Sequence, residues 1–270
     1  MTDLEIPFEK DRHGHYRFFE ILPGFLSWTL LLTPLLLSLI NVTAAVFFVL
    51  LYLLISFVRS LAYSIRAVAG YLTMRRQMKL DWPGLRADVE AGQPTGAHIA
   101  RPKWHLANLE RLQKREAVIK PSQLLHAIII ATVNESREVL EPTIQAVLDS
   151  DYDPKRMILV IAYEGRAGQA AEDRVQELLE LYGDRFQHAM AVKHPANVPG
   201  EIIGKGGNIS CAGRAVKKYL AAQKVDPGNV VVTTLDADNR PDKRYFAALD
   251  YLYCSVPDPH RASFQPLAMF

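Results

Sequence analysis

Two aspartates one residue apart, Asp236 and Asp238, have the types and spacing to do chemistry. They follow the apolar run 230–235, whose β-branched residues predict a buried strand, and a polar turn with a proline at position 241 ends it. Two carboxylates this close repel each other unless a cation joins them, and oxygen ligands suit Mg²⁺ or Mn²⁺ bridged to a substrate phosphate. The pair therefore indicates a metal site, with an ordinary solvated turn as the alternative.

Polar residues also follow two other predicted strands. Thr132, Asn134 and Glu135 come at the end of the apolar run 124–132, and Glu164 follows the run 157–162. In open α/β sheets the carboxyl ends of the strands form the ligand-binding edge. These residues are therefore candidates for contacting a nucleotide.

A glycine-rich stretch, residues 204–208, opens a predicted helix before the run 230–235. Lys205 between glycines at a helix start suits a diphosphate, through its charge and the backbone N–H groups, although an ordinary turn has the same composition. The dinucleotide-binding motif G-x-G-x-x-G is not found after the first predicted strand, and the phosphate-binding motif G-x-x-x-x-G-K-S/T occurs nowhere. This argues against a dehydrogenase and against a P-loop nucleotidase.

The net charge and the two cysteines further restrict the class of partner and the cellular location. The formal net charge of +2 gives no basis for a nucleic-acid partner. The two cysteines, Cys211 and Cys254, are far apart and fit no metal or redox motif, and reduced thiols suit a cytosolic location.

Strands and helices alternate along the second half of the chain. Strands are expected at residues 124–132, 157–162, 186–192 and 230–235, with a fifth beginning within 262–270. Helices are expected at 136–149, 168–182, 205–223 and 241–254, the last opened by Pro241. This alternation predicts an α/β fold with a mostly parallel sheet and helices on both faces.

Residues 21–58 contain no charged side chain over 38 positions. One helix of that length would measure about 57 Å, about twice the hydrocarbon core of a bilayer. Two spans of about 18–20 residues with a tight turn within 38–43, where Asn41 is the most polar residue, fit better. A buried soluble hairpin is the alternative, and the length of the run disfavours it. The sequence predicts a transmembrane helical hairpin.

Basic residues flank this hairpin on both sides. Lys10, Arg12 and Arg17 precede it, and five basic residues at positions 59–79 follow it, with no acid before Asp81. The positive-inside rule places both flanks in the cytoplasm. We expect an integral plasma-membrane protein with a cytoplasmic N-terminal segment (1–20), two spans (21–58) and a cytoplasmic catalytic domain.

Residues 59–120 are expected to form a basic juxtamembrane segment and a connector. The stretch 59–79 mixes arginines with apolar residues, as an interfacial helix or a continuation of the second span would. Helix breakers at 82–84 and 92–96 predict a connector. Residues 101–120 predict a helix that lies against either the membrane or the globular domain at 121–270.

The four polar segments, in this order along the chain, resemble family 2 glycosyltransferases. The resemblance covers about residues 124–270, and the hairpin resembles the membrane anchors of the cellulose, chitin and hyaluronan synthase-like branch. It implies the GT-A fold and a DXD motif, with polysaccharide synthesis in the cell envelope as the process. It further implies a nucleotide-diphospho-sugar donor, with a UDP-sugar expected, and a glycan or lipid-linked acceptor.

The resemblance also implies roles for individual residues. Nucleotide-sugar binding would fall to Thr132, Asn134, Glu135, Glu164, Lys205, Asn208 and Asp236, and Mg²⁺ or Mn²⁺ binding to Asp236 and Asp238. Many members have an aspartate where Glu164 stands, and that aspartate reads the uracil edge. The longer side chain here leaves the donor base open.

A catalytic base is missing from this pattern. After Asp238 the carboxylates are Asp242, Asp250 and Asp258, all on the next predicted helix or at its exit. The family's acceptor-site acid, Gln-x-x-Arg-Trp segment and C-terminal membrane helices would lie beyond Phe270. We therefore expect the donor-binding half of an incomplete transferase domain, weak or inactive alone. A membrane-anchored nucleotide-binding or scaffold module without transfer activity is the alternative.

Overall fold

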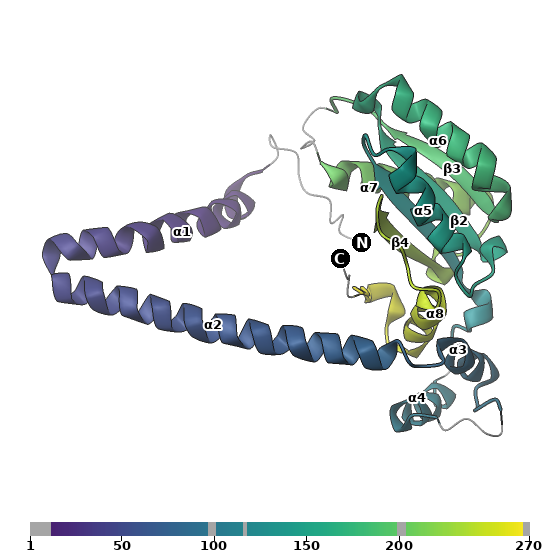
Figure 1. Cartoon of the computed structure of the whole chain (residues 1–270), viewed down its shortest axis with the longest axis horizontal. Coiled ribbons are helices and arrows are strands. Elements are labelled where there is room, and N and C mark those ends of the chain that lie inside the picture. The colour runs from purple at the N-terminus through teal and green to yellow at the C-terminus, as the bar shows by residue number, and fades with distance from the viewer. Residues whose placement is uncertain (1–11, 97–100, 116–117, 199–203, 267–270) are drawn as a thin grey trace. The chain divides into compact units, whose positions relative to one another are not determined.

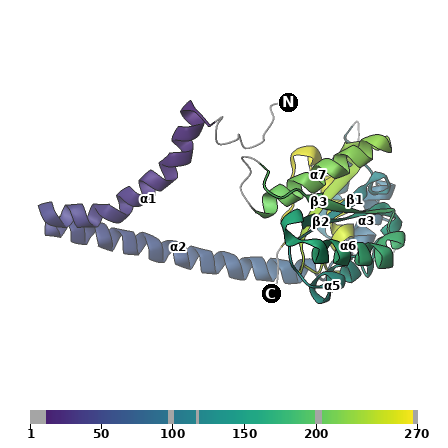
Figure 2. The same cartoon turned by 90° about the horizontal axis from the view of Figure 1, so that it is seen from above.

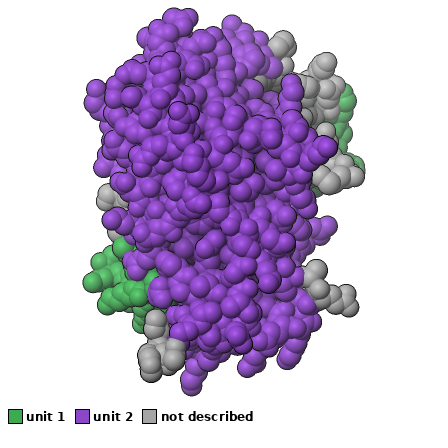
Figure 3. All heavy atoms as spheres, turned by 90° about the vertical axis from the view of Figure 1, so that its right-hand side faces the viewer, with its two compact units in different colours: residues 1–80, 266–270 green, residues 81–265 purple. Residues whose placement is uncertain are grey.

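The computed structural model describes residues 12–96, 101–115, 118–198 and 204–266. The chain divides into two compact units, residues 1–80 with 266–270 and residues 81–265 (Figure 3). The first unit contains the two long apolar helices. Every residue predicted to bind a nucleotide-sugar or a metal lies in the second.

The first unit is a helical hairpin made of α1 (Gly14–Ile40) and α2 (Val42–Gln77). Asn41 separates the helices with an extended backbone, and its side-chain Oδ1 accepts a 3.1 Å hydrogen bond from the Ala44 amide. This bond satisfies one of the unpaired N–H groups at the start of α2. Both helices are long and apolar enough to cross a membrane. The chain thus turns at the residue that the sequence indicates.

α2 continues without a break from its apolar part into the basic stretch that follows residue 58 (Figure 1 and Figure 2). Its 36 residues make it about 54 Å long. Of the two expectations for residues 59–79, the structure therefore favours a continuation of the second span. The predicted spans of 18–20 residues are shorter than the observed helices of 27 and 36 residues because charged residues extend both helices.

A parallel four-stranded sheet in the order β3-β2-β1-β4 forms the centre of the second unit. The strands are β1 (Leu125–Thr132), β2 (Met157–Glu164), β3 (His188–His194) and β4 (Val230–Asp236). The predicted α/β class with a parallel sheet is confirmed. The predicted fifth strand is wrong for residues 262–266, which form no strand, and residues 267–270 lie outside the described part.

Helices cover the sheet on both faces. Successive residues of β1 point to opposite sides of the sheet, and since the residues on both sides are apolar, each face is buried by helices. Ile128 and Ile130 share one core with side chains of α5 (Arg137–Leu148) and α6 (Gln169–Tyr182). Ala127 and Ile129 share the other with side chains of α7 (Lys205–Ala222). The long apolar runs of β1 and β2 are explained by this double coverage.

A helix replaces part of the predicted connector. α3 (Trp82–Ala91) begins where the Asp81 side chain accepts a 3.1 Å hydrogen bond from the Gly84 amide, and its proline lies in the first turn. It ends at Gly92, whose φ of 71° is the left-handed conformation that favours glycine. Trp-Pro-Gly therefore starts a helix here, and the prediction of a breaker was wrong.

α4 (Lys103–Gln113) confirms the helix expected within 101–120. Its buried side packs on α8 (Tyr245–Ser255), where the Tyr251 hydroxyl meets His105 Nδ1 at 3.0 Å and accepts from Asn108 Nδ2 at 2.9 Å. This face therefore lies against the globular unit. α8 itself starts at Tyr245 and not at Pro241, because the Asp242 side chain accepts from the Arg244 amide and forms a turn before the helix.

Two buried carboxylates hold these helices in place, and one of them also contacts the sheet. Asp250 of α8 is fully buried and accepts hydrogen bonds from Arg86 Nε (2.7 Å), His126 Nε2 (2.8 Å) and the Tyr152 hydroxyl (3.1 Å). Because its partners come from α3, β1 and the loop after α5, this one side chain connects three segments.

Asp88 of α3 is also fully buried. Its carboxylate accepts from the Thr95 amide (2.6 Å) and from Arg101 Nη2 (3.1 Å), and it lies 3.0 Å from His105 Nε2. A buried charge is tolerated only when it is paired and hydrogen-bonded, as here. The Asp88 cluster fixes α4 against α3.

Candidate functional site

The order of the strands creates a switch point between β1 and β4. The chain adds β2 and β3 on one side of β1 and then crosses through α7 to add β4 on the other side. Ligands of open α/β sheets bind outside the carboxyl ends of the strands at such a point. The residues predicted from sequence come from the ends of β1, β2 and β4 and from the start of α7.

The exit of β4 presents two exposed carboxylates. β4 ends at Asp236, and the chain then turns, with the Asn239 amide donating a 3.1 Å hydrogen bond to the Asp236 carbonyl. Asp236 and Asp238 are exposed, whereas Ala237 between them is buried. The Ala237 carbonyl accepts a 2.7 Å hydrogen bond from the buried Thr143 hydroxyl of α5. This bond holds the exit in place while both carboxylates face solvent.

Lys205 joins the start of α7 to this carboxylate pair. Its ammonium forms an ion pair with Asp236, and both side chains are about half exposed. An exposed pair of this kind contributes little to stability. The Lys205 ammonium therefore lies at the switch point, and exchanging Asp236 for another anion there would cost little stability.

Asn208 joins α7 to two strands. Its side chain is 1% exposed, and Nδ2 donates to the carbonyls of Thr132 (3.3 Å) and Ala162 (3.0 Å). Its Oδ1 is buried and has no hydrogen-bond partner among the residues that the structure describes. Asn208 thus fixes the first turn of α7 against the ends of β1 and β2.

At the exit of β1, the side chain of Glu135 accepts hydrogen bonds from the end of the strand. Glu135 Oε2 accepts from the Thr132 hydroxyl (2.7 Å) and from the Val133 amide (2.6 Å). Partial burial raises the pKa of Glu135, but these two hydrogen bonds and the nearby Lys205 charge outweigh it, so the pKa lies below its usual value. Glu135 is therefore ionised at neutral pH, and Asn134 beside it is exposed.

The exit of β2 carries a buried carboxylate. Glu164 is 4% exposed, and its Oε2 lies 3.3 Å from His194 Nδ1 and 3.5 Å from Arg166 Nε. The next residue, Gly165, passes so close to β3 that a Cβ there would meet the His194 carbonyl oxygen at 2.9 Å. Glu164 thus lies at the same sheet edge, where the ends of the neighbouring strands β2 and β3 approach each other closely.

The donor set at β4 is compatible with a divalent cation held jointly with a phosphate. Mg²⁺ in such sites takes one or two carboxylates and completes its coordination with phosphate oxygens and water. Asp236 and Asp238 supply the carboxylates. In the described part of the chain, no three His, Cys, Asp or Glu side chains are grouped to hold a metal by themselves.

The three carboxylates that follow Asp238 differ in availability. Asp250 is buried and fully engaged, as described above. Asp242 caps the turn before α8, and Asp258 lies 3.7 Å from Arg261 in a surface ion pair. None of these three contacts any of the residues predicted to bind the nucleotide-sugar in the hydrogen bonds and ion pairs described.

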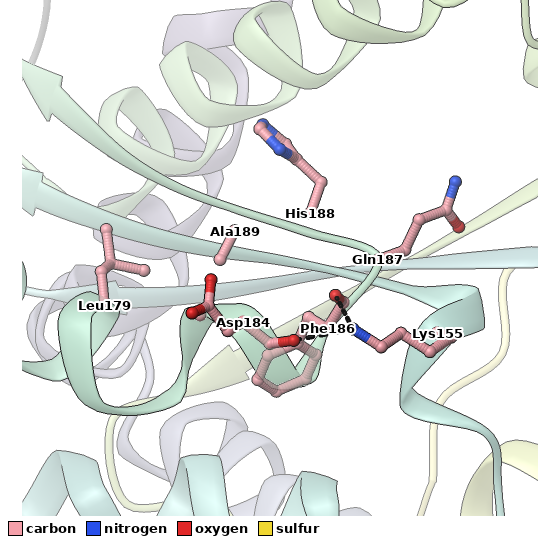
Figure 4. Close-up of a pocket in the computed structure, with 8 residues that line it drawn as sticks. Lys155, Leu179, Asp184, Phe186, Gln187, His188 and Ala189 are labelled. Atoms are coloured by element: carbon pink, nitrogen blue, oxygen red, sulfur yellow. Dashed lines mark hydrogen bonds between the residues drawn. The ribbon is translucent and has the colours of Figure 1, made fainter.

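A shallow hollow of about 380 Å³ lies at the other edge of the sheet, near the start of β3 (Figure 4). Lys155 Nζ points into it but donates to the carbonyls of Asp184 (2.7 Å) and Phe186 (3.3 Å). This hollow contains none of the residues predicted from sequence. We therefore place the candidate site at the switch point, where charged groups converge.

Sequence reasoning missed His194 and Arg174. Arg174 donates to the Glu135 carbonyl at 2.6 Å. His194 lies beside Glu164, as does Arg166 from the same polar strand exit. The pairing of β2 with β3 aligns Glu164 with His194 and brings these two residues together. A local sequence pattern offers no signal for such a pairing.

No protein-family model matches this chain, and no curated protein sequence matches it significantly.

Proposed function

We propose that this chain is a membrane-anchored glycosyltransferase of the family 2 type with a GT-A arrangement. In this proposal it binds a nucleotide-diphospho-sugar with Mg²⁺ or Mn²⁺ and transfers the sugar to a polysaccharide or lipid-linked acceptor. The observation that carries the proposal is the convergence of Glu135, Lys205, Asn208 and Asp236 at the switch point. These residues are far apart in the sequence, where their segments follow the order that the resemblance implies, and they lie close together in the structure.

The charges at this point suit a diphosphate. Lys205 neutralises Asp236 in the structure, and the same ammonium is complementary to phosphate oxygens. A bound divalent cation, held by Asp236 and Asp238, would supply the positive charge that stabilises a departing nucleoside diphosphate. Both aspartates are exposed, Asp236 at the end of β4 and Asp238 in the turn that follows.

In this proposal Asn208 does not contact the ligand directly. Its donor atoms are already used by the carbonyls of Thr132 and Ala162. It acts as a positioning residue that sets Lys205, three residues earlier, beside the end of β4. Glu135 positions the β1 exit in the same manner, through Thr132 and Val133.

A transfer assay tests the proposal. The full chain in lipid vesicles is supplied with a panel of UDP-sugars and Mn²⁺, and release of UDP and labelled product is measured. The turnover expected of a donor-binding half is weak. Slow product formation that is lost in Asp238→Asn and kept in Asp184→Asn, which removes the same charge at the opposite edge, supports the transferase. Binding of UDP without product or UDP release favours the alternative, a membrane-anchored nucleotide-binding or scaffold module.

We also propose that both ends of the hairpin, and hence the second unit, face the cytoplasm of a plasma membrane. The support is the pair of basic flanks around two helices that can span a bilayer. Single cysteines introduced at positions 5 and 170, in a chain without Cys211 and Cys254, should show the same accessibility to an impermeant maleimide in sealed cells. Opposite accessibility would mean an odd number of spans.

A further inference from the structure

The part of α2 beyond its charge-free segment carries a narrow apolar stripe. We name this stripe the seam, and it consists of Leu61, Ile65, Val68 and Leu72. All four side chains are between 48% and 62% exposed. The spacing of four, three and four residues is the heptad spacing of a coiled coil. Every other position in 59–73 is small, polar, basic or aromatic, so the apolar face is the two-per-heptad stripe of a seam.

The seam lies away from α1. Ala45 is the only buried residue among the described residues of α2, and it marks the side that meets α1 near the turn. Sixteen residues separate Ala45 from Leu61, which places them about 160° apart around the helix axis. The two helices diverge from the turn (Figure 1), so α1 leaves the seam uncovered.

The seam also extends beyond a bilayer. The charge-free part of α2 ends at Val58, after about 25 Å of helix, which is close to the thickness of a hydrocarbon core. Residues 59–77 continue as the same unbroken helix for about 28 Å. A helix that leaves the membrane without a break cannot also lie flat in the interface. The seam therefore needs a protein partner to remove it from water.

We propose that the seam pairs with the seam of a second copy of this chain in a short parallel coiled coil. Two copies inserted in the same direction have a two-fold axis along the membrane normal, so equal positions face each other. Arg59 and Arg66 lie about 140–160° from Leu61 and remain on the outside of such a pair.

Basic residues near the end of α2 mark where the paired region would stop. Arg75 occupies the next heptad position after Leu72, in the last turn of α2, which ends at Gln77. Like charges facing each other at the seam repel, so the paired region ends at Leu72 and the chains separate before α3. The inference concerns assembly and does not depend on sugar transfer.

Disulfide cross-linking in native membranes tests the pairing. Cys211→Ser and Cys254→Ala remove the two native cysteines, and single cysteines are then introduced in the full chain as Ile65→Cys, Leu72→Cys, Ala67→Cys and Gly70→Cys. We expect the two seam positions to form dimers about tenfold faster than the two positions off the seam, because a disulfide needs Cβ atoms close together. Equal rates at all four positions, or rates that fall in proportion to dilution with lipid, would overturn the proposal.

A charge substitution provides a second test that does not depend on cross-linking. Val68→Asp places a carboxylate in the seam, and Ala67→Asp places the same charge one position away on the outer face. Single-molecule photobleaching of the labelled full chain in vesicles should show about a tenfold smaller dimer fraction for Val68→Asp and no change for Ala67→Asp. Equal dimer fractions would refute the seam. So would a monomeric chain in which lipid shields the cysteine of Ile65→Cys or Leu72→Cys from a water-soluble maleimide.

Discussion

Asp250 and Asp238 lie in the same unit, but their surroundings differ. Asp250 is fully buried and holds Arg86, His126 and Tyr152 within hydrogen-bond distance. Asp238 is exposed in the turn after a strand, near Asp236, whose ion pair with Lys205 is about half exposed. The contrast shows that carboxylates with satisfied partners hold this fold together, whereas carboxylates left in solvent at the switch point remain available to a ligand.

The largest effect that would test this contrast is the loss of Asp250. Asp250→Ala should lower the free energy of unfolding by about 3–5 kcal/mol, because the buried His126 Nε2 and the Tyr152 hydroxyl lose their partner and the partly buried Arg86 loses its counter-charge. Urea unfolding of the full chain in detergent, followed by near-ultraviolet circular dichroism, measures this change.

Asp238→Ala is the matched control and should stay within about 0.5 kcal/mol of the parent, since its carboxylate is exposed. Equal stability losses for Asp250→Ala and Asp238→Ala would show that the two regions do not differ in the way described.

A smaller effect is expected at Asn208, which belongs to the site but is buried like the structural residues. Asn208→Ala removes two hydrogen bonds to strand-end carbonyls and should cost about 1–2 kcal/mol of stability. Asn134→Ala, at an exposed position of the same site, should leave stability unchanged. If Asn208→Ala unfolds at the same urea concentration as the parent, the positioning role assigned to Asn208 is wrong.

The smallest effect concerns Glu135 and depends on pH. The pKa of Glu135 is lowered in the folded chain, so its ionised form stabilises the fold at pH values above the unfolded pKa of about 4.3. This contribution is lost as the pH falls through the lowered pKa. The parent should therefore be more stable than Glu135→Gln at pH 7, and the difference should shrink toward zero as the pH falls below about 4. A difference that stays constant or grows in acid would contradict the hydrogen bonds assigned to this carboxylate.

The sequence predicts best the elements whose residues carry a continuous signal. β1 and β2 are found to within two residues because both faces are buried and their apolar runs are uninterrupted. α3 was missed because proline and glycine were taken as breakers, although Asp81 before them is a helix cap. The sequence thus contained a helix-start signal, an aspartate followed by a proline in the first turn, which favours a helix over a connector.

The site was predictable in part. Asp236, Asp238 and Lys205 stand out by type and position, and the order of parallel strands predicts that they share an edge. The partners of Asp250 could not be predicted, because His126 lies 124 positions away in the chain and contacts it only after the sheet has formed. Long-range polar pairs of this kind have no local pattern.

Calorimetric titration of UDP with Mn²⁺ into the purified full chain tests the central claim most directly. The account predicts binding to the parent and to Asp184→Asn, and binding at least about tenfold weaker for Asp238→Asn, with near-ultraviolet circular dichroism unchanged. Equal affinity for Asp238→Asn and the parent, or no metal-dependent binding by the parent, would contradict a nucleotide-diphosphate site at the switch point.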